Sequence, residues 1–277
     1  MTDSDHGYAF DNAVAGQRDR LRALEAVFDP GTFRRLGECG VAPGWHCLEV
    51  GAGAGSVARW LAERVGSEGS VLATDLDLTT FGEPGHHQLT ARVHDLTRDP
   101  LPEGRFDLVH VRFVLAWLPD PAAAVRRLFE ALRPGGVLVA EDLDFVSAVP
   151  DPAMDHESAE LLARVVRAHL AVVVDRSGFD PTHGRRLRSR LEDAGLVDVA
   201  AEGQVTTWRG GEPGGELWRL TFAQLREPMV GAGLVGGPEV DRAVELCRSG
   251  LSYLSPLAVA AWGRRPERLT CPLHDIA

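Results

Sequence analysis

Leu48-Glu-Val-Gly-Ala-Gly-Ala-Gly-Ser-Val-Ala-Arg-Trp-Leu61 is the stretch on which the interpretation of this chain depends. It predicts a short buried strand, a glycine-rich turn and the first turns of a helix. Gly51, Gly53 and Gly55 allow a sharp bend and leave no Cβ in the way of a ligand. The amides at the start of the helix can point at an anionic or electron-rich group. The stretch therefore predicts a nucleotide-binding turn.

The spacing of the three glycines indicates which kind of nucleotide the turn can bind. A dinucleotide fingerprint, G-x-G-x-x-G/A, needs its third small residue three positions after the second glycine. Ser56 stands at that position, and Gly55 comes one residue early. The resulting G-x-G-x-G pattern argues against an NAD(P) turn. Taken alone it is a weak signal, because glycine-rich turns also serve plain chain reversal.

Composition limits the class of protein. The chain has 277 residues, 44% of them apolar, which suits one large α/β domain with an insertion or cap. Its 40 acidic and 29 basic residues give a formal charge of −11, and this argues against a non-specific nucleic-acid binder. Every basic residue is Arg, as in proteins of high-GC genomes, so no Lys is present to form a Schiff base.

The four cysteines are scattered and form no C-x-x-C motif, so we expect neither a metal site nor a disulfide framework. The first residues are acidic and lack an apolar core, and no apolar run approaches the length of a membrane span. The expectation is a cytoplasmic protein with no membrane partner. The cysteines are Cys39, Cys47, Cys247 and Cys271.

Strands and helices are expected to alternate from residue 46 onward. Each expected strand is nearly continuously apolar, which is typical of a parallel sheet buried on both faces. The expected strands are 46–50, 70–75, 89–94, 106–111 and 137–140, with helices at 56–65 and 121–132.

Two short helices, at 11–28 and 32–39, are expected before the first strand, separated by Asp29-Pro30-Gly31. They serve either as scaffold or as a lid over a cofactor, with Tyr8 and Phe10 as contacts. The second half predicts helices at 155–176, 180–194, 217–230 and 238–248, and strands at 196–208 and 254–262.

Acidic residues stand near the ends of the first three strands. Glu49 is either buried beneath the glycine turn, fixing its amides, or an anchor for the N-terminal helix. Asp75, at the end of the second strand, can accept hydrogen bonds from both ribose hydroxyls, whereas Asp77 is expected to be solvated. Asp95 can accept from an adenine amino group while the Leu96 amide meets the ring, or it can cap a turn.

Five motifs in order over residues 40–145 resemble those of class I S-adenosylmethionine-dependent methyltransferases, of the small-molecule type found in high-GC bacteria. The motifs are Leu48-Glu-Val-Gly-Ala-Gly-Ala-Gly55, Ala73-Thr-Asp-Leu-Asp77, His94-Asp-Leu96, Phe106-Asp-Leu-Val109 and Leu132-Arg-Pro-Gly-Gly136.

The resemblance implies an α/β fold, a Rossmann-like three-layer sandwich. Its seven-stranded sheet is mostly parallel, with an antiparallel last strand at 253–264. Residues 1–39 would form an N-terminal helical lid, and 40–277 the methyltransferase domain. A helical insert after the fifth strand, at 146–190, would shape the substrate pocket.

The resemblance also implies S-adenosyl-L-methionine as the cofactor, and no metal. Arg112 falls where the family contacts the methionine part of the cofactor; the alternative is a structural salt bridge. The residues implied to bind the cofactor are Glu49, Gly51, Ala52, Gly53, Gly55, Asp75, Leu76, Asp95, Leu96, Val111 and Arg112.

The chain departs from a common family pattern at Trp117, where many small-molecule members carry a histidine. The remaining candidates for a catalytic base are His156, His169 and the acids Glu141 and Asp142. We predict the two histidines as catalytic. His169 lies on the apolar stripe of its helix, so a core position is its alternative.

The leading function is methyl transfer to the O, N or C atom of a small molecule, such as a bacterial secondary metabolite or antibiotic precursor. The alternatives are a methyltransferase fold that keeps its cofactor for a non-methylating role, and an NAD(P)-dependent oxidoreductase. The glycine spacing and the Arg133-Pro-Gly-Gly136 turn argue against the oxidoreductase. A homodimer is left open.

Overall fold

The computed structural model describes residues 16–267. Tyr8 and Phe10, expected as cofactor contacts, lie outside this range.

A seven-stranded sheet forms the centre of the described chain, in the order β3-β2-β1-β4-β5-β10-β7. β10 is antiparallel to both of its neighbours, β5 and β7, so the other strands all run in one direction. This confirms the predicted fold class, with the last strand shorter than the predicted 253–264. The strands are β1 (His46–Val50), β2 (Ser70–Asp75), β3 (Leu89–Val93), β4 (Phe106–Arg112), β5 (Leu132–Asp144), β7 (Val197–Gln204) and β10 (Leu257–Arg264).

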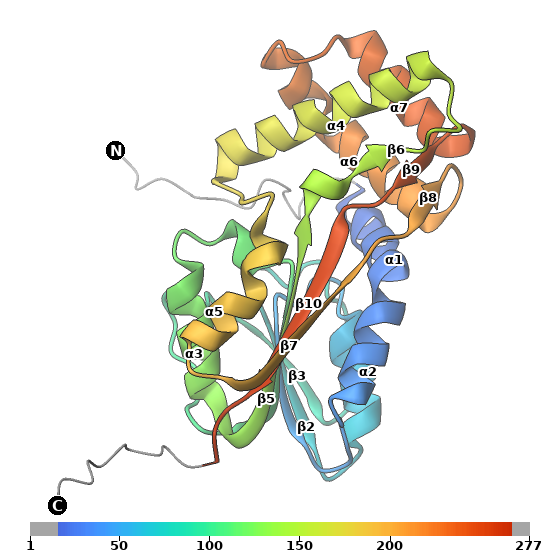
Figure 1. Ribbon diagram of the computed structural model, residues 1–277. Helices are drawn as coiled ribbons and strands as arrows, with labels where there is room; N and C mark the ends of the chain where they lie inside the picture. The colour runs from blue at the N-terminus through green and yellow to red at the C-terminus, as the bar shows by residue number, and fades with distance from the viewer. Residues whose placement is uncertain (1–15, 268–277) are drawn as a thin grey trace, which may run out of the picture.

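Helices cover both faces of this sheet and complete the sandwich (Figure 1). α1 (Gln17–Glu38) and α2 (Ser56–Val65) lie on one face, and α3 (Pro121–Ala131) and α5 (Leu187–Asp193) lie on the other. Every residue of β4 is buried, because this central strand has a core on each side. That explains why the strands are continuously apolar in sequence.

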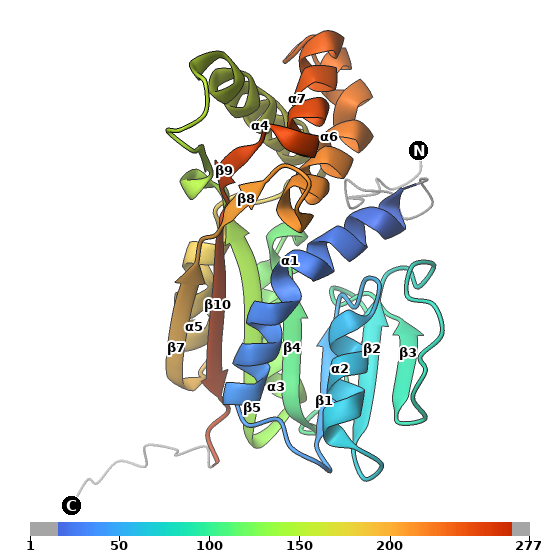
Figure 2. The ribbon, with the colours of Figure 1, turned by 90° about the vertical axis from the view of Figure 1, so that its right-hand side faces the viewer.

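A second layer of structure, here called the cap, stands over the carboxyl ends of the strands (Figures 1 and 2). It consists of residues 145–177 and 207–254. Its helices are α4 (His156–Ser177), α6 (Pro213–Gly231) and α7 (Gly237–Ser249), and its small sheet has the order β6-β9-β8. The small strands are β6 (Val149–Pro150), β8 (Thr207–Arg209) and β9 (Ser252–Leu254).

The cap differs from the predicted insert at 146–190, because half of it comes from a later segment between β7 and β10. The helix expected at 180–194 is also split, into a short 3-10 turn, η3 (His183–Arg186), and α5, which belongs to the sandwich. Two further turns, η1 (Leu115–Trp117) and η2 (Phe145–Ser147), lead from β4 and β5 towards the cap.

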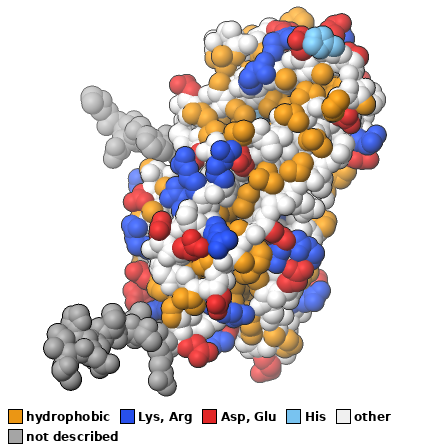
Figure 3. Space-filling model, in the orientation of Figure 1, with side chains coloured by type: hydrophobic (Ala, Val, Ile, Leu, Met, Phe, Trp, Pro, Cys, Tyr) orange, Lys and Arg blue, Asp and Glu red, His pale blue; other side chains and the backbone are white. Residues whose placement is uncertain are grey.

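Most of the exposed large apolar side chains of the described residues belong to the cap and its connections, and Figure 3 shows apolar side chains scattered over it. Those in this part are Val146, Val149, Val174, Val205, Leu234 and Leu254. None of the helices within 16–267 combines the length and hydropathy needed to span a membrane.

The N-terminal segment is one helix rather than the two predicted, and Pro30 lies inside it. A proline in a helix interior costs roughly 3 kcal/mol. Phe28 and Leu36, on either side of it, are buried, and such side chains contribute about 1.5–3 kcal/mol each. Burial against the sheet and cap therefore outweighs the local break. Figure 2 shows the helix changing direction along its length.

β5 is longer than the predicted strand, 137–140, because its pairing with β10 continues to Asp144. This extension carries Glu141 and Asp142 within the strand, on opposite sides of the sheet.

Candidate functional site

The glycine turn after β1 has the left-handed backbone that its sequence requires. Gly51 and Gly53 have φ angles of 73° and 55°. A Cβ at Gly51 would lie 2.1 Å from a methyl carbon of Val114, so this position has no room for a side chain. Among the residues that the structure describes, a Cβ at Gly53 would meet only a methyl carbon of Leu21, at 3.8 Å. The space above Gly53 is therefore open to a ligand.

Asp75 lies directly beside this turn. The Gly53 amide donates a hydrogen bond of 2.8 Å to Asp75 Oδ2, and the Asp77 amide donates to Oδ1 at 3.2 Å. Burial raises the pKa of Asp75 in spite of these bonds. Asp77 instead accepts from the amide and hydroxyl of Thr79, in an exposed turn. The carboxylate predicted to bind ribose is therefore joined to the turn through the Gly53 amide.

Three further residues predicted to bind the cofactor, Leu76, Asp95 and Leu96, follow the carboxyl ends of β2 and β3. Leu76 follows Asp75 and is 61% exposed, which leaves an apolar surface for a ring. Asp95 Oδ1 accepts from the amide and hydroxyl of Thr97, so it has the turn role that was its alternative. Leu96 is buried in the core.

Ala52 is buried within the glycine turn. The side chain of Val111 is buried in the core between β4 and α3, so its predicted contact with the cofactor cannot come from the side chain.

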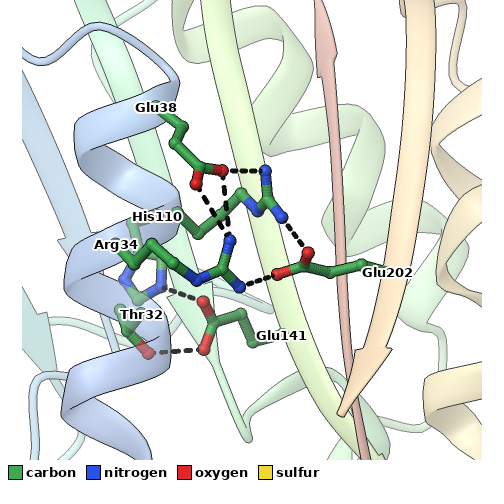
Figure 4. A network of polar contacts seen from close by, with 7 residues as sticks. Thr32, Arg34, Glu38, His110, Glu141 and Glu202 are labelled. Carbon is green, nitrogen blue, oxygen red and sulfur yellow. Dashed lines mark hydrogen bonds and ion pairs between the residues drawn. The ribbon is translucent and has the colours of Figure 1, made fainter.

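Glu49 lies buried below the turn, but its carboxylate does not bond the turn amides. Glu49 Oε2 lies 2.6 Å from Nδ1 of His110, on the neighbouring strand β4. His110 Nε2 lies 3.9 Å from Glu141 Oε1, and Glu141 Oε2 accepts a 2.6 Å bond from Thr32 of α1 (Figure 4). These side chains form a buried polar chain from β1 through β4 and β5 to α1.

The charge state of this chain is set by its two carboxylates. Burial lowers the pKa of His110, but Glu49 and Glu141 on either side raise it more, to about 9. The imidazole is therefore positively charged at neutral pH. Sequence reasoning did not select His110. A histidine inside an otherwise apolar strand, beside a strand carrying Glu49, was the signal available.

Arg112, at the end of β4, connects the sheet to α1. Its guanidinium donates to the Thr32 hydroxyl and to Asp29 Oδ1, each at 2.8 Å. The structural salt bridge that was its alternative role is thus present. Its contact with the methionine part of the cofactor stays a prediction.

The middle of α1 covers the glycine turn. Glu25 Oε1 accepts from the Ser56 amide at 3.0 Å, and Asp29 Oδ1 accepts from the Ser56 hydroxyl at 3.1 Å. The first amide of α2 is therefore capped by a carboxylate from α1.

An adjacent face of α1 borders an apolar pocket of about 740 Å³ of empty space, including the part open to solvent. The pocket lies between α1, the carboxyl ends of β4 and β5, and the cap. Most of its lining is aliphatic or aromatic. Its lining residues are Arg20, Leu24, Phe28, Phe113, Trp117, Asp142, Leu143, Phe145, His169, Val173, Phe179, Trp208, Leu217, Trp218, Thr221 and Pro256.

Asp142 is the acid of this pocket. Its side chain is almost completely buried, and its oxygens accept hydrogen bonds from the amides of Ala116 and Leu143, each at 3.0 Å. Burial raises the pKa of Asp142 to about 7, against the effect of these two bonds.

The two predicted catalytic histidines lie in different places. His169 lines the pocket, and its Nδ1 lies 3.0 Å from the Val166 carbonyl. Burial lowers its pKa to about 4, so it is neutral near pH 7. His156 is 87% exposed at the start of α4, beside Glu160, and is not part of the pocket. The structure therefore does not bring the two together.

Two tryptophans in the pocket wall have unused hydrogen-bond donors. The indole N–H groups of Trp208 and Trp218 are buried and have no partner among the described residues. A buried donor without a partner costs about 1–3 kcal/mol. A bound molecule with acceptor oxygens can supply that partner.

No group of three or more potential metal ligands occurs within residues 16–267. Cys39, Cys47 and Cys247 are buried free thiols.

The turn and its surroundings fit S-adenosylmethionine. Gly53 leaves open space in a left-handed turn, Asp75 offers a buried carboxylate beside it, and Leu76 offers an exposed apolar side chain. These are the chemical groups that a nucleoside with a ribose diol and an adenine ring requires.

Comparisons with known proteins agree with this assignment. Residues 17–201 match the family model described as a methyltransferase domain. Methyltransferase str3 of Strobilurus tenacellus is 31% identical, over 54% of this chain and 52% of its own length. A ubiquinone/menaquinone biosynthesis C-methyltransferase, UbiE of Stenotrophomonas maltophilia, is 30% identical, over 53% of this chain and 70% of its own. The chain thus spans about half to two thirds of these relatives.

A solved structure with a similar fold is phosphoethanolamine N-methyltransferase 2 of Haemonchus contortus, in complex with phosphomonomethylethanolamine and S-adenosylhomocysteine. It is 16% identical with a TM-score of 0.55, covering 91% of this chain and 61% of that one. The family model covers well over half of the chain. The chain belongs to the S-adenosylmethionine-dependent methyltransferases with the class I fold.

Proposed function

We propose that this protein transfers a methyl group from S-adenosylmethionine to a small aromatic molecule held in the pocket under the cap. The observation that carries this proposal is that one helix borders both places. Arg20, Leu24 and Phe28 of α1 line the pocket at intervals of four residues. Leu21 and Glu25, one position further along, contact the glycine turn and the start of α2.

The end of β4 supports the same arrangement. Phe113 lines the pocket, and the next residue, Val114, contacts the position of a Cβ at Gly51. Phe113 has a φ of 58°, an uncommon backbone angle for a bulky side chain. The cofactor turn and the pocket are therefore separated by single residues on two elements, as transfer between two bound molecules requires.

In this proposal Gly53, Asp75, Leu76 and Asp95 hold the cofactor. Asp75 accepts from the ribose hydroxyls while its bond to Gly53 fixes its position. When bound, S-adenosylmethionine supplies a methyl group already activated on a sulfonium. The protein's contribution is then to align the acceptor and to keep water out of the pocket.

The pocket wall supports an aromatic acceptor. Seven of its side chains are Phe or Trp, and such rings prefer offset or edge-to-face contact with another ring. Within this proposal the acceptor is a secondary metabolite, the class that the sequence resemblance predicts; the Arg-only composition is typical of a high-GC genome. The cap contributes α4, α6 and β8 to the wall, so we assign acceptor choice to it and the covering of the cofactor to α1.

Calorimetry with S-adenosylmethionine, S-adenosylhomocysteine and NAD(P) tests the cofactor. A screen of aromatic hydroxyls, amines and quinols with radiolabelled methyl donor tests the transfer. We expect binding of the first two compounds and label on at least one acceptor. Tight binding of the donor with no transfer to any acceptor class would favour a non-methylating role, and binding of NAD(P) alone would favour an oxidoreductase.

A further inference from the structure

We propose that Asp142 accepts the proton of the methyl acceptor, and that the acceptor is therefore a neutral aromatic molecule with a weakly acidic hydroxyl, such as a phenol. This inference rests on the proposed function, since it names the substrate class of the same pocket.

Two hydrogen bonds hold the carboxylate of Asp142 in place, and its oxygens still have lone pairs that can accept a proton. Oδ2 accepts from the Ala116 amide and Oδ1 accepts from the Leu143 amide. Each oxygen has a second lone pair, because an ionised carboxylate offers about four acceptor sites. The two amides come from η1 and β5, so the side chain is fixed from two elements.

Several groups packed around Asp142 influence its charge. Burial and the nearby Asp180 carboxylate both favour the protonated form. Arg20 of α1 lines the same pocket, and its positive charge helps to lower the pKa of His169. His169 of α4 and His183 of η3 have pKa values lowered to about 4, so both are neutral over the working range. Among the described residues of this wall, Asp142 is the group whose pKa lies near neutral pH.

The other candidate bases are less suitable. His169 is too weakly basic at a pKa of about 4, and its Nδ1 is bonded to a carbonyl. Glu141 is held by Thr32 and His110 on the other side of β5, and it does not line the pocket. A base whose pKa lies near the working pH is the most effective one.

The proposed step is a single displacement. The hydroxyl oxygen of the acceptor forms a bond to the methyl carbon, and the bond between this carbon and sulfur breaks, with its electron pair going to sulfur. The O–H proton goes to an oxygen of Asp142. The products are a methyl ether, a neutral thioether and a protonated carboxyl group, which returns its proton to solvent.

Two probes of similar shape test the proposal by binding, without turnover. 2-Naphthol is neutral at pH 8.5, whereas 1-nitro-2-naphthol is ionised there. In the wild-type protein with S-adenosylhomocysteine, the ionised Asp142 should accept from neutral naphthol and repel the naphtholate. Asp142→Asn should weaken naphthol binding about tenfold or more and strengthen nitronaphtholate binding by a similar factor.

Asp144→Asn is the matched control. Asp144 is a buried carboxylate two residues further along β5, paired with Arg185 and absent from the pocket wall. This variant should bind the two probes with the same relative affinities as the wild-type protein. Thermal unfolding of both variants checks that they fold.

The wild-type protein alone provides a second measurement, which holds even if Asp142→Asn fails to fold. Its affinity for 2-naphthol should rise about tenfold between pH 5.5 and 8.5, with a midpoint near 7. A flat pH profile, or equal binding of each probe to wild type and Asp142→Asn, would overturn the role of Asp142 and leave the proposed function standing. If neither probe binds, the aromatic pocket itself is wrong, and both proposals fall.

Discussion

Charged groups around the glycine turn differ in their pairing from the polar groups of the pocket wall under the cap. In the sandwich, charged groups near the turn have partners: Glu49 meets His110, Arg112 meets Asp29, and the Gly53 amide meets Asp75. In the pocket wall under the cap, two indole N–H groups have no partner among the described residues, and burial favours the neutral form of Asp142.

This difference distinguishes the glycine turn, which suits one constant ligand, from the pocket wall under the cap. Paired charges in a low-dielectric interior fix a geometry, because each partner resists displacement. The aromatic wall has two indole N–H donors without a partner among the described residues, and different bound molecules can accept hydrogen bonds from them.

The buried chain of the sandwich should be the most sensitive to truncation. His110→Ala removes the positive charge that lies between Glu49 and Glu141 and leaves only the more indirect effect of Arg112 on them. Breaking a buried ion pair in this way costs about 3–5 kcal/mol. Urea unfolding should show this decrease. His156→Ala, on an exposed histidine of the cap, should change stability by less than about 0.5 kcal/mol. Equal effects would mean that the buried chain is not what holds α1 and the sheet together.

The same histidine predicts the direction of a pH effect. Its folded-state pKa, about 9, is higher than the ordinary 6.5, so protons bind the folded protein more tightly. The stability from this group is complete below pH 6.5 and is lost as the pH rises through 9. Unfolding between pH 6 and 10 should show this decline in the wild type, and His110→Gln should remove its part of the slope.

A side chain at Gly53 should abolish cofactor binding. Gly53→Val fills the open space above the turn, and we expect at least a hundredfold loss of affinity for S-adenosylmethionine by calorimetry. The matched control is Gly104→Val, at a remote loop glycine with φ of 60° and likewise free space around its Cβ position. Both variants carry the same backbone strain, about 1–2 kcal/mol. Normal cofactor affinity in Gly53→Val would move the cofactor away from this turn.

Asp75→Ala should weaken cofactor binding at least tenfold, because each hydrogen bond to a charged acceptor contributes about 1.5–3 kcal/mol before compensation. The loss also frees the Gly53 amide, which Asp75 now holds. Asp77→Ala should have a much smaller effect, since the Gly53 amide bonds Asp75, whereas the Asp77 carboxylate accepts from the amide and hydroxyl of Thr79 in an exposed turn. Calorimetry that finds the two variants alike would contradict the assignment.

The smallest effect is expected at His169. His169→Phe keeps a ring among its neighbours Phe145, Trp218 and Phe222, so we expect KM for the acceptor to rise only a few-fold. Steady-state kinetics should show kcat within about threefold of wild type and an unchanged pH profile. A loss of kcat by 10²–10⁴, typical of a missing general base, would return His169 to the role predicted from sequence.

Several elements were predictable from short stretches of sequence. The strand, turn and helix around Gly51 to Gly55 are where the pattern placed them, because glycine spacing and apolar runs act over a few residues. The predicted helix break at Pro30 was wrong. The local cost of the proline, a few kcal/mol, is outweighed by the burial of Phe28 and Leu36 on either side of it. The helices at 217–230 and 238–248 were predicted, but their place in the cap was not. Their sequence pattern is that of any amphipathic helix and does not show which surface they pack against.

The apolar strands, the glycine turn and the acids near the strand ends can all be predicted from the sequence. Which polar groups meet depends on how the chain folds. Glu49 and His110 lie 61 positions apart in the chain and become neighbours only because β1 pairs with β4. Asp142 faces an aromatic pocket only because two distant segments fold into one cap above it. Burial and pairing set the charge of both sites, and neither can be read from spacing along the chain.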